Sequence, residues 1–72
     1  MNKIYYNRLK TVLEEKGVPN KKLAREMGVS EKTVSRWRNN VTQPSLELLY
    51  KIARYLQTDV RQLLESTNGN DS

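Results

Sequence analysis

Apolar residues recur along the chain at the three- and four-residue spacing of amphipathic helices, in segments separated by glycine, asparagine and proline. The first segment covers residues 3–16 and ends at Gly17. A second, shorter segment covers residues 21–27, with Asn20 as its N-cap and Gly28 at its end. Because glycine accepts a left-handed backbone, each of the two glycines predicts the end of a helix. The apolar stripe of the first helix would comprise Tyr5, Leu9, Val12, Leu13 and Lys16.

Three further segments complete the pattern. Ser30 caps a predicted helix over residues 31–39, and Ser45 caps one that runs to about residue 57. Residues 59–64 predict a last helical turn, because an acidic residue is followed three positions later by glutamine. No alternating pattern typical of strands is visible. The sequence therefore predicts a compact all-α fold of five short helices.

Length and composition restrict the class of protein. The 72 residues suffice for one small domain, which we place at residues 1–65, followed by a polar tail at residues 66–72. The chain has no cysteine and no histidine, which excludes disulfides and the commonest zinc sites, and we expect no metal or other cofactor. Its apolar stretches are too short to span a bilayer, and no signal peptide follows Met1, so we expect a cytoplasmic protein.

Positive charge is concentrated in one part of the chain. Residues 16–42 contain seven basic residues and only two acidic ones, Glu26 and Glu31, so this window accounts for the whole net charge of +5. A positive field confined to one segment indicates a polyanionic partner that is met by one face. A merely solvated basic face is the alternative, and charge alone does not distinguish the two.

The stretch LAREMGVSEKTVSRW, residues 23–37, breaks one helix at Gly28 and starts the next two residues later. Two short helices joined by such a turn cross at a large angle, so the first can pack inward while the second is presented. Val34 and Trp37 would anchor the presented helix from behind. A presented helix with basic residues on its outward face suits the major groove of DNA. The outward residues would be Lys32, Thr33, Ser35 and Arg36.

Residues 23–37, together with residues 44–53, resemble the Xre-type helix-turn-helix domain shared by lambda-type repressors and Cro. The resemblance covers residues 9–64 and implies a five-helix, lambda-repressor-like fold that reads DNA with its third helix. The motifs that carry it are Leu23-Ala24, Gly28-Val29-Ser30, Val34-Ser35 and Trp37, followed by Pro44 and Ile52-Ala53.

Three positions depart from the family pattern. Asn20 stands where the family usually has a glutamine that supports the recognition helix and contacts phosphate, and the shorter side chain can keep the phosphate contact but not both roles. Arg38 stands where the family usually has glutamate, paired with an arginine at the position of Leu13. Since both partners are replaced, we expect Arg38 to face phosphate. Asn40 replaces a loop glycine, which the tolerance of asparagine for the left-handed conformation permits.

The resemblance implies two sets of DNA-contacting residues. Base readout is predicted for Glu31, Lys32, Thr33 and Arg36. Phosphate contacts are predicted for Asn20, Lys21, Ser30, Arg38, Asn39, Thr42 and Gln43. Backbone amides at helix N-termini suit phosphate because they already point toward an anion.

The function so implied is that of a sequence-specific regulator of transcription that binds double-stranded DNA, a repressor, associated with the nucleoid when bound. An antitoxin that binds both a toxin protein and its own operator is the alternative. An enzyme is not expected, because the sequence offers no convergent carboxylates and no glycine loop that could cradle phosphate. Membrane binding does not fit, since the basic residues lie on two different helices rather than along one.

A single recognition helix reads only a few base pairs, so we expect a homodimer on a pseudo-palindromic operator, formed in solution or completed only on DNA. The predicted contact surface combines the loop before the fourth helix with the last helical turn. Apolar residues there exceed what so small a core needs. The candidates are Leu46, Tyr50, Val60 and Leu63.

Overall fold

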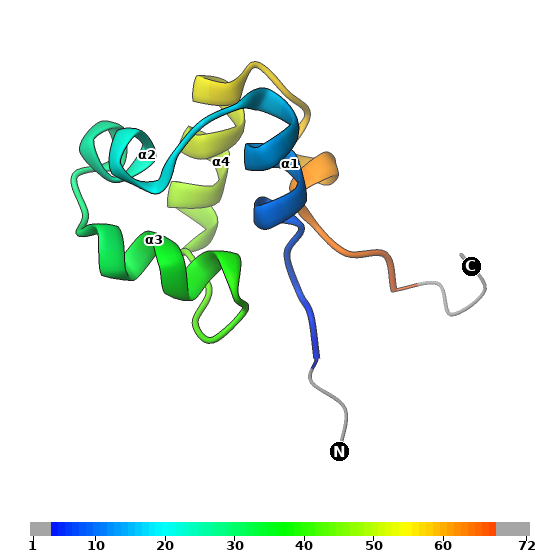
Figure 1. Ribbon diagram of the computed structural model, residues 1–72. Coiled ribbons are helices and arrows are strands. Elements are labelled where there is room, and N and C mark those ends of the chain that lie inside the picture. The colour runs from blue at the N-terminus through cyan, green and yellow to red at the C-terminus, as the bar shows by residue number, and fades with distance from the viewer. Residues whose placement is uncertain (1–3, 68–72) are drawn as a thin grey trace.

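The computed structural model describes residues 4–67 of the chain. The elements are α1 (Leu9–Lys16), α2 (Asn20–Met27), α3 (Glu31–Arg38), α4 (Leu46–Leu56) and a 3-10 turn, η1 (Val60–Leu63). α4 packs against both α2 and η1, while α1 packs against α3 and η1. Figure 1 shows α2 and α3 on one side of the bundle and η1 on the other. Of the predicted polar tail, only residues 66 and 67 belong to the described part of the chain.

The core is formed by the inward faces of all five elements. Trp37, which is 4% exposed, and the fully buried Val34 come from α3, as the sequence predicts. The pattern of apolar residues therefore places Leu9, Val12, Leu13, Val34 and Trp37 correctly on the inward faces of α1 and α3, because helical spacing keeps them on one side, whereas Lys16 is exposed. The core residues are Leu9, Val12, Leu13, Leu23, Ala24, Val34, Trp37, Leu49, Ile52, Ala53, Leu56 and Leu63.

The predicted helix ends are confirmed at Gly17, Gly28, Ser30 and Ser45, whereas Asn20, predicted as an N-cap, is the first residue of α2 and follows the cap position at Pro19. Gly17 and Gly28 have φ angles of 66° and 70°, in the left-handed region that ends a helix. The hydroxyls of Ser30 and Ser45 each accept a hydrogen bond from the backbone N–H three residues later, at 3.0 and 3.1 Å. These caps satisfy backbone groups that the helices themselves leave unpaired.

The first helix begins at Leu9, so the predicted helical start is wrong for residues 4–8. The Asn7 side chain accepts a hydrogen bond from the backbone N–H of Leu9 at 2.9 Å, which fixes a turn just before α1. The preceding residues are extended and pair antiparallel with the chain after η1, around a bridge between Asn7 and Leu64. Tyr5, expected on the inner stripe, is consequently exposed.

The last predicted helical turn is found, but as a single 3-10 turn, η1, so residues 4–67 contain four α-helices rather than five. The Asp59 carboxylate accepts a hydrogen bond from the backbone N–H of Arg61 at 2.8 Å, and the next N–H bonds back to the Asp59 carbonyl. The turn then stops because Leu64 is held in the bridge to the N-terminal segment. The side-chain hydrogen bond from Arg61 lowers the pKa of the Asp59 carboxyl to about 2.

Asn40 has a φ angle of 57°, which confirms the left-handed conformation predicted for this position. Its side chain adds a function that glycine could not supply. Oδ1 accepts hydrogen bonds from the backbone N–H groups of Tyr6 and Asn7, at 2.8 and 3.0 Å, and Nδ2 donates to the Asn7 carbonyl at 3.1 Å. The carboxamide therefore pairs with the N-terminal segment as the peptide group of a neighbouring strand would.

Asn40 and Gln57 are the non-glycine residues with positive φ in the described chain, and they form a matched pair for mutation. Glycine relieves the backbone at both positions, but only Asn40→Gly removes hydrogen bonds to buried groups. We expect Asn40→Gly to lower the free energy of unfolding by about 1–3 kcal/mol and Gln57→Gly to leave it within about 1 kcal/mol of the wild type. Urea denaturation measures both, and equal effects would contradict the role given to the Asn40 carboxamide.

Candidate nucleic-acid interface

α2 and α3 pack against each other and are joined by a tight turn at Gly28 (Figure 1). The N–H of Val29 donates to the carbonyl of Ala24 at 3.0 Å, which closes the C-terminal end of α2. Val29 itself is half-buried against the core. The turn thus redirects the chain while it remains attached to the core, and α3 lies along the outer edge of the bundle.

The outward face of α3 carries three exposed charged side chains, those of Glu31, Lys32 and Arg36. Within residues 4–67 none of them forms a hydrogen bond or ion pair through its side chain. Lys32 and Arg36 lie one helical turn apart on the same face, where two cations repel each other unless an anion lies between them. Since Val34 and Trp37 hold the opposite face in the core, this charged face points outward.

Thr33 and Ser30, each predicted to contact DNA, form hydrogen bonds with each other. The Ser30 hydroxyl accepts the backbone N–H of Thr33 at 3.0 Å, and the two hydroxyl oxygens lie 2.9 Å apart. Thr33 is half-buried. Both side chains therefore stabilise the start of α3, and the fully exposed charged groups on its outward face are those of Glu31, Lys32 and Arg36.

Arg38 has an acidic partner within the fold, so the expectation that it is free to face phosphate is wrong. Its guanidinium donates to Asn20 Oδ1 at 2.6 Å and to Glu14 Oε2 at 3.3 Å. Glu14 directly follows the fully buried Leu13, the position at which the resemblance to the family placed the partner of residue 38. Arg38 and Glu14 thus link α1 and α3. Asn20 extends this link to α2.

We expect Arg38→Ala to destabilise the fold, because one guanidinium connects α1, α2 and α3. The loss should be about 1–2 kcal/mol, since the hydrogen bonds are charge-assisted but Glu14 is largely exposed. Arg25→Ala, which removes an exposed arginine of α2, is the matched control and should change the free energy of unfolding by less than about 0.5 kcal/mol. Thermal or urea denaturation compares them, and equal losses would contradict this role.

The remaining predicted phosphate contacts fall into two groups. Lys21, Asn39 and Thr42 are exposed at the start of α2 and in the loop after α3. Gln43 is exposed but its amide is bonded at both ends, since Nε2 donates to Asn40 Oδ1 at 3.2 Å and Oε1 accepts from Asn7 Nδ2 at 2.8 Å. Gln43 therefore helps to hold the loop after α3 against the N-terminal segment.

Asn7 and Glu14 are the positioning residues that the sequence reasoning missed. Asn7 is 3% exposed and its Nδ2 also donates to the carbonyl of Trp37, at 2.9 Å, near the C-terminal end of α3. Neither residue lies near the helix-turn-helix in the sequence. Helical spacing gives no signal for either contact, because it does not show which helices pack side by side.

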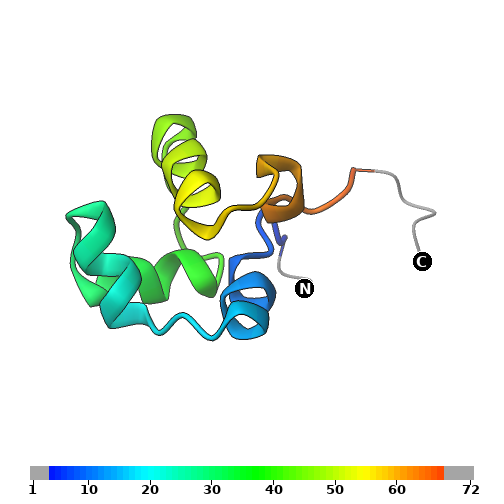
Figure 2. The ribbon, with the colours of Figure 1, turned by 90° about the horizontal axis from the view of Figure 1, so that it is seen from above.

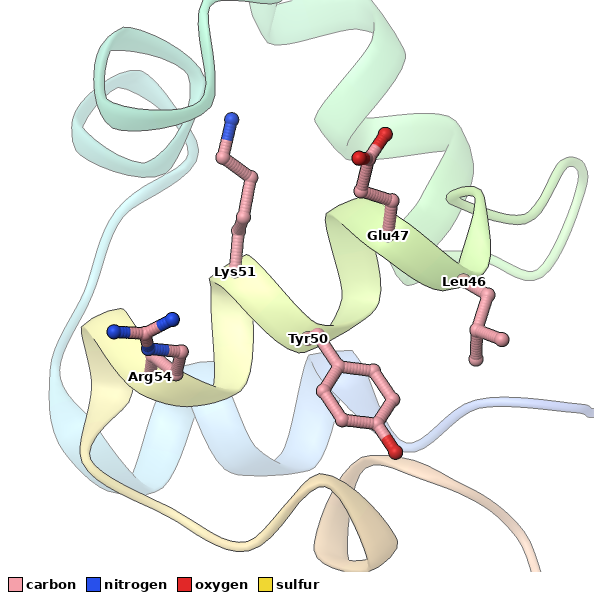
Figure 3. Close-up of a pocket in the computed structure, with 5 residues that line it drawn as sticks. All are labelled: Leu46, Glu47, Tyr50, Lys51 and Arg54. Carbon is pink, nitrogen blue, oxygen red and sulfur yellow. The ribbon is translucent and has the colours of Figure 1, made fainter.

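The four candidates for a dimer contact are not equivalent. Leu63 is fully buried in the core, so the interpretation of this residue as surplus to the core is wrong. Val60 is half-buried against the same core. Leu46 and Tyr50 are exposed and line a shallow groove on α4 together with Glu47, Lys51 and Arg54. Figure 3 shows Leu46 and Tyr50 on one side of α4, and Glu47 and Lys51 on the other.

Within residues 4–67, no helix is long and apolar enough to cross a membrane. The same part of the chain contains no cluster of three or more acidic side chains placed to hold a metal ion.

Comparisons with known proteins agree with this geometry. Residues 9–63 match the helix-turn-helix family. The fold is similar to the crystal structure of a protein from Bacteroides fragilis to which DNA binding is ascribed, with 52% sequence identity and a TM-score of 0.80. The similarity covers 82% of this chain and 95% of the other. A comparison with the curated proteins found no match.

Proposed function

The chain belongs to the helix-turn-helix family, a family of binding domains rather than enzymes, and from this we propose that it is a sequence-specific DNA-binding regulator of transcription. α3 would enter the major groove, which admits one α-helix. The observation that carries the proposal is the outward face of α3, where Lys32 and Arg36 are exposed and unpaired within residues 4–67. Guanine acceptors are natural partners for both side chains. Glu31 could accept a hydrogen bond from a cytosine amino group.

Several cations outside α3 support the proposal. Lys21 lies in the first turn of α2, where backbone N–H groups also favour an anion. The basic window of the sequence coincides with α2, α3 and their flanking turns, so phosphates on both sides of the groove would meet positive charge. The similar protein from Bacteroides fragilis, to which DNA binding is ascribed, is consistent with this function.

We assign the protein to repression rather than activation because occupancy of an operator is sufficient to exclude other proteins from it. Binding would use two copies of the chain. Two α3 helices about 34 Å apart, one turn of the duplex, would read a pseudo-palindrome with half-site centres about ten base pairs apart. Each copy alone would read too few bases to select one site among genomic competitors.

The experiment that tests this function is selection of bound sites from a pool of random duplex DNA by the purified protein. We expect enrichment of a two-fold symmetric sequence, bound by two chains per duplex. Binding that is equally tight to every sequence would contradict specific readout, and an asymmetric site with one chain would contradict the paired arrangement. Co-purification of a toxin protein from the native host would favour the antitoxin interpretation in place of a plain repressor.

A further inference from the structure

The two ends of the described chain form a paired surface, which we call the terminal ribbon and define as residues 4–7 and 64–67. Four of the seven exposed large apolar residues of the described chain lie on it, namely Ile4, Tyr5, Tyr6 and Leu64. They line one shallow groove with Glu65, Ser66 and Thr67. Such a concentration of exposed apolar side chains on a small domain marks an interaction surface.

The terminal ribbon is held in place by backbone hydrogen bonds. The N–H of Arg8 donates to the Leu63 carbonyl at 2.8 Å, and the N–H of Glu65 donates to the Tyr6 carbonyl at 2.9 Å. The Asn40 carboxamide holds the other edge of the N-terminal segment. Since these contacts order the backbone before any partner arrives, association on this surface avoids much of the entropic cost of ordering a free chain end.

Charge separates this surface from the rest of the molecule. Among residues 4–67, the groove of the terminal ribbon is lined by one charged side chain, that of Glu65, and by no cation. Figure 1 and Figure 2 show the terminal segments on the side of α1 and η1, away from α2. A surface without cations does not suit the phosphate backbone. The terminal ribbon is therefore free for another partner while α3 contacts DNA.

The same charge argument favours a second copy of this chain as that partner. In a two-fold contact, each patch meets the identical patch of the other copy. The groove on α4 is lined by two cations, Lys51 and Arg54, and one carboxylate, Glu47, so a two-fold contact there would bring together a net positive charge from each copy, in a protein whose net charge is already +5. The terminal ribbon would instead bring apolar side chains together with a single carboxylate from each side.

We propose that the terminal ribbon is the surface through which two copies of this chain associate, in place of the α4 face. The proposal deepens the proposed function and rests on it for its biological purpose, because the pair would present two α3 helices to one operator. Asn40 and Asn7 connect the ribbon to the C-terminal end of α3. The position of α3 relative to the two-fold axis would therefore be set by hydrogen bonds within each copy.

Two exposed leucines provide the test. Leu64 lies on the terminal ribbon and Leu46 on α4, and both side chains are exposed. Sedimentation equilibrium of the full chain without DNA measures association. We expect Leu64→Glu, which places one new carboxylate on each side of the two-fold axis, to weaken the dimer by about a hundredfold. Leu46→Glu should change the dissociation constant of the dimer by no more than about threefold.

A second variant and a thermal denaturation measurement test whether a weaker dimer results from a loss of folding. Ile4→Glu lies at the exposed end of the ribbon and should weaken the dimer as Leu64→Glu does, with an unchanged thermal transition. A wild-type chain that stays monomeric at about millimolar concentration, or a dimer broken by Leu46→Glu but not by the ribbon variants, would overturn the proposal. DNA binding is measured independently. A chain that dimerises through the terminal ribbon but does not bind DNA would contradict the proposed function and leave the proposed interface intact. A chain that binds a specific site as a monomer would contradict the proposed interface and leave the DNA-binding function intact.

Discussion

Arg36→Ala is expected to weaken binding to the selected operator by about 1–3 kcal/mol, the discrimination of one good bidentate contact to a base. Affinity for unrelated DNA should remain nearly unchanged. The reason is the position of Arg36 on the exposed face of α3, one turn from Lys32, where its guanidinium has no partner within residues 4–67. A group that reads base edges contributes mainly when the correct base is present.

The measurement is fluorescence anisotropy on the operator and on an unrelated duplex of equal length, at one fixed salt concentration. Arg54→Ala removes the same charge from α4 and serves as the matched control. This control gives the loss of DNA affinity expected from the change in net charge alone, which should be similar on both duplexes. An equal loss on both duplexes for Arg36→Ala would place Arg36 among the phosphate contacts and leave base readout to Lys32 and Glu31.

Leu63→Ala is expected to lower the free energy of unfolding by about 2–5 kcal/mol, the usual cost of truncating a fully buried leucine. Leu63 is 0% exposed and comes from η1, which packs on both α1 and α4. Its carbonyl also accepts the hydrogen bond that starts the terminal ribbon. Two helices and a backbone hydrogen bond hold the surrounding atoms apart, so the cavity cannot collapse easily and the loss should lie in the upper part of this range.

Urea denaturation provides the free energies, with Leu46→Ala as control. Leu46 is 70% exposed on α4, so its truncation should change stability by no more than about 0.5 kcal/mol. A domain of this size has a total stability of only about 4–10 kcal/mol, so the Leu63 variant should show a large shift of its midpoint. Similar small losses for both leucines would restore Leu63 to the surface role that its sequence position suggested.

The sequence predicts the elements that depend on neighbouring residues and fails where distant residues decide. The turn at Gly28 and the caps at Ser30 and Ser45 are local, and all three are found as expected. The start of α1 is different, because Asn7 is held by Asn40, 33 residues away. No helical or strand periodicity records such a contact.

The same distinction applies to the candidate site. Helical spacing places Val34 and Trp37 inward, so the opposite face of α3 could be assigned without a structure. The partner of Arg38 could not, since Glu14 lies 24 residues earlier and spacing does not reveal which helices pack side by side. The fate of Leu63 was hidden for a related reason. Whether an apolar residue completes a core or remains on the surface depends on the volume the other elements leave.

The ion pair between Glu14 and Arg38 limits how freely α3 can be replaced by the corresponding helix of another protein. A helix that carries a glutamate after the tryptophan would place that carboxylate against Glu14 and remove the donor to Asn20. The graft would lose stability for reasons unrelated to the bases it reads. Chimeras built to alter specificity should therefore exchange positions 14 and 38 together, treating the helix and its contact on α1 as one module.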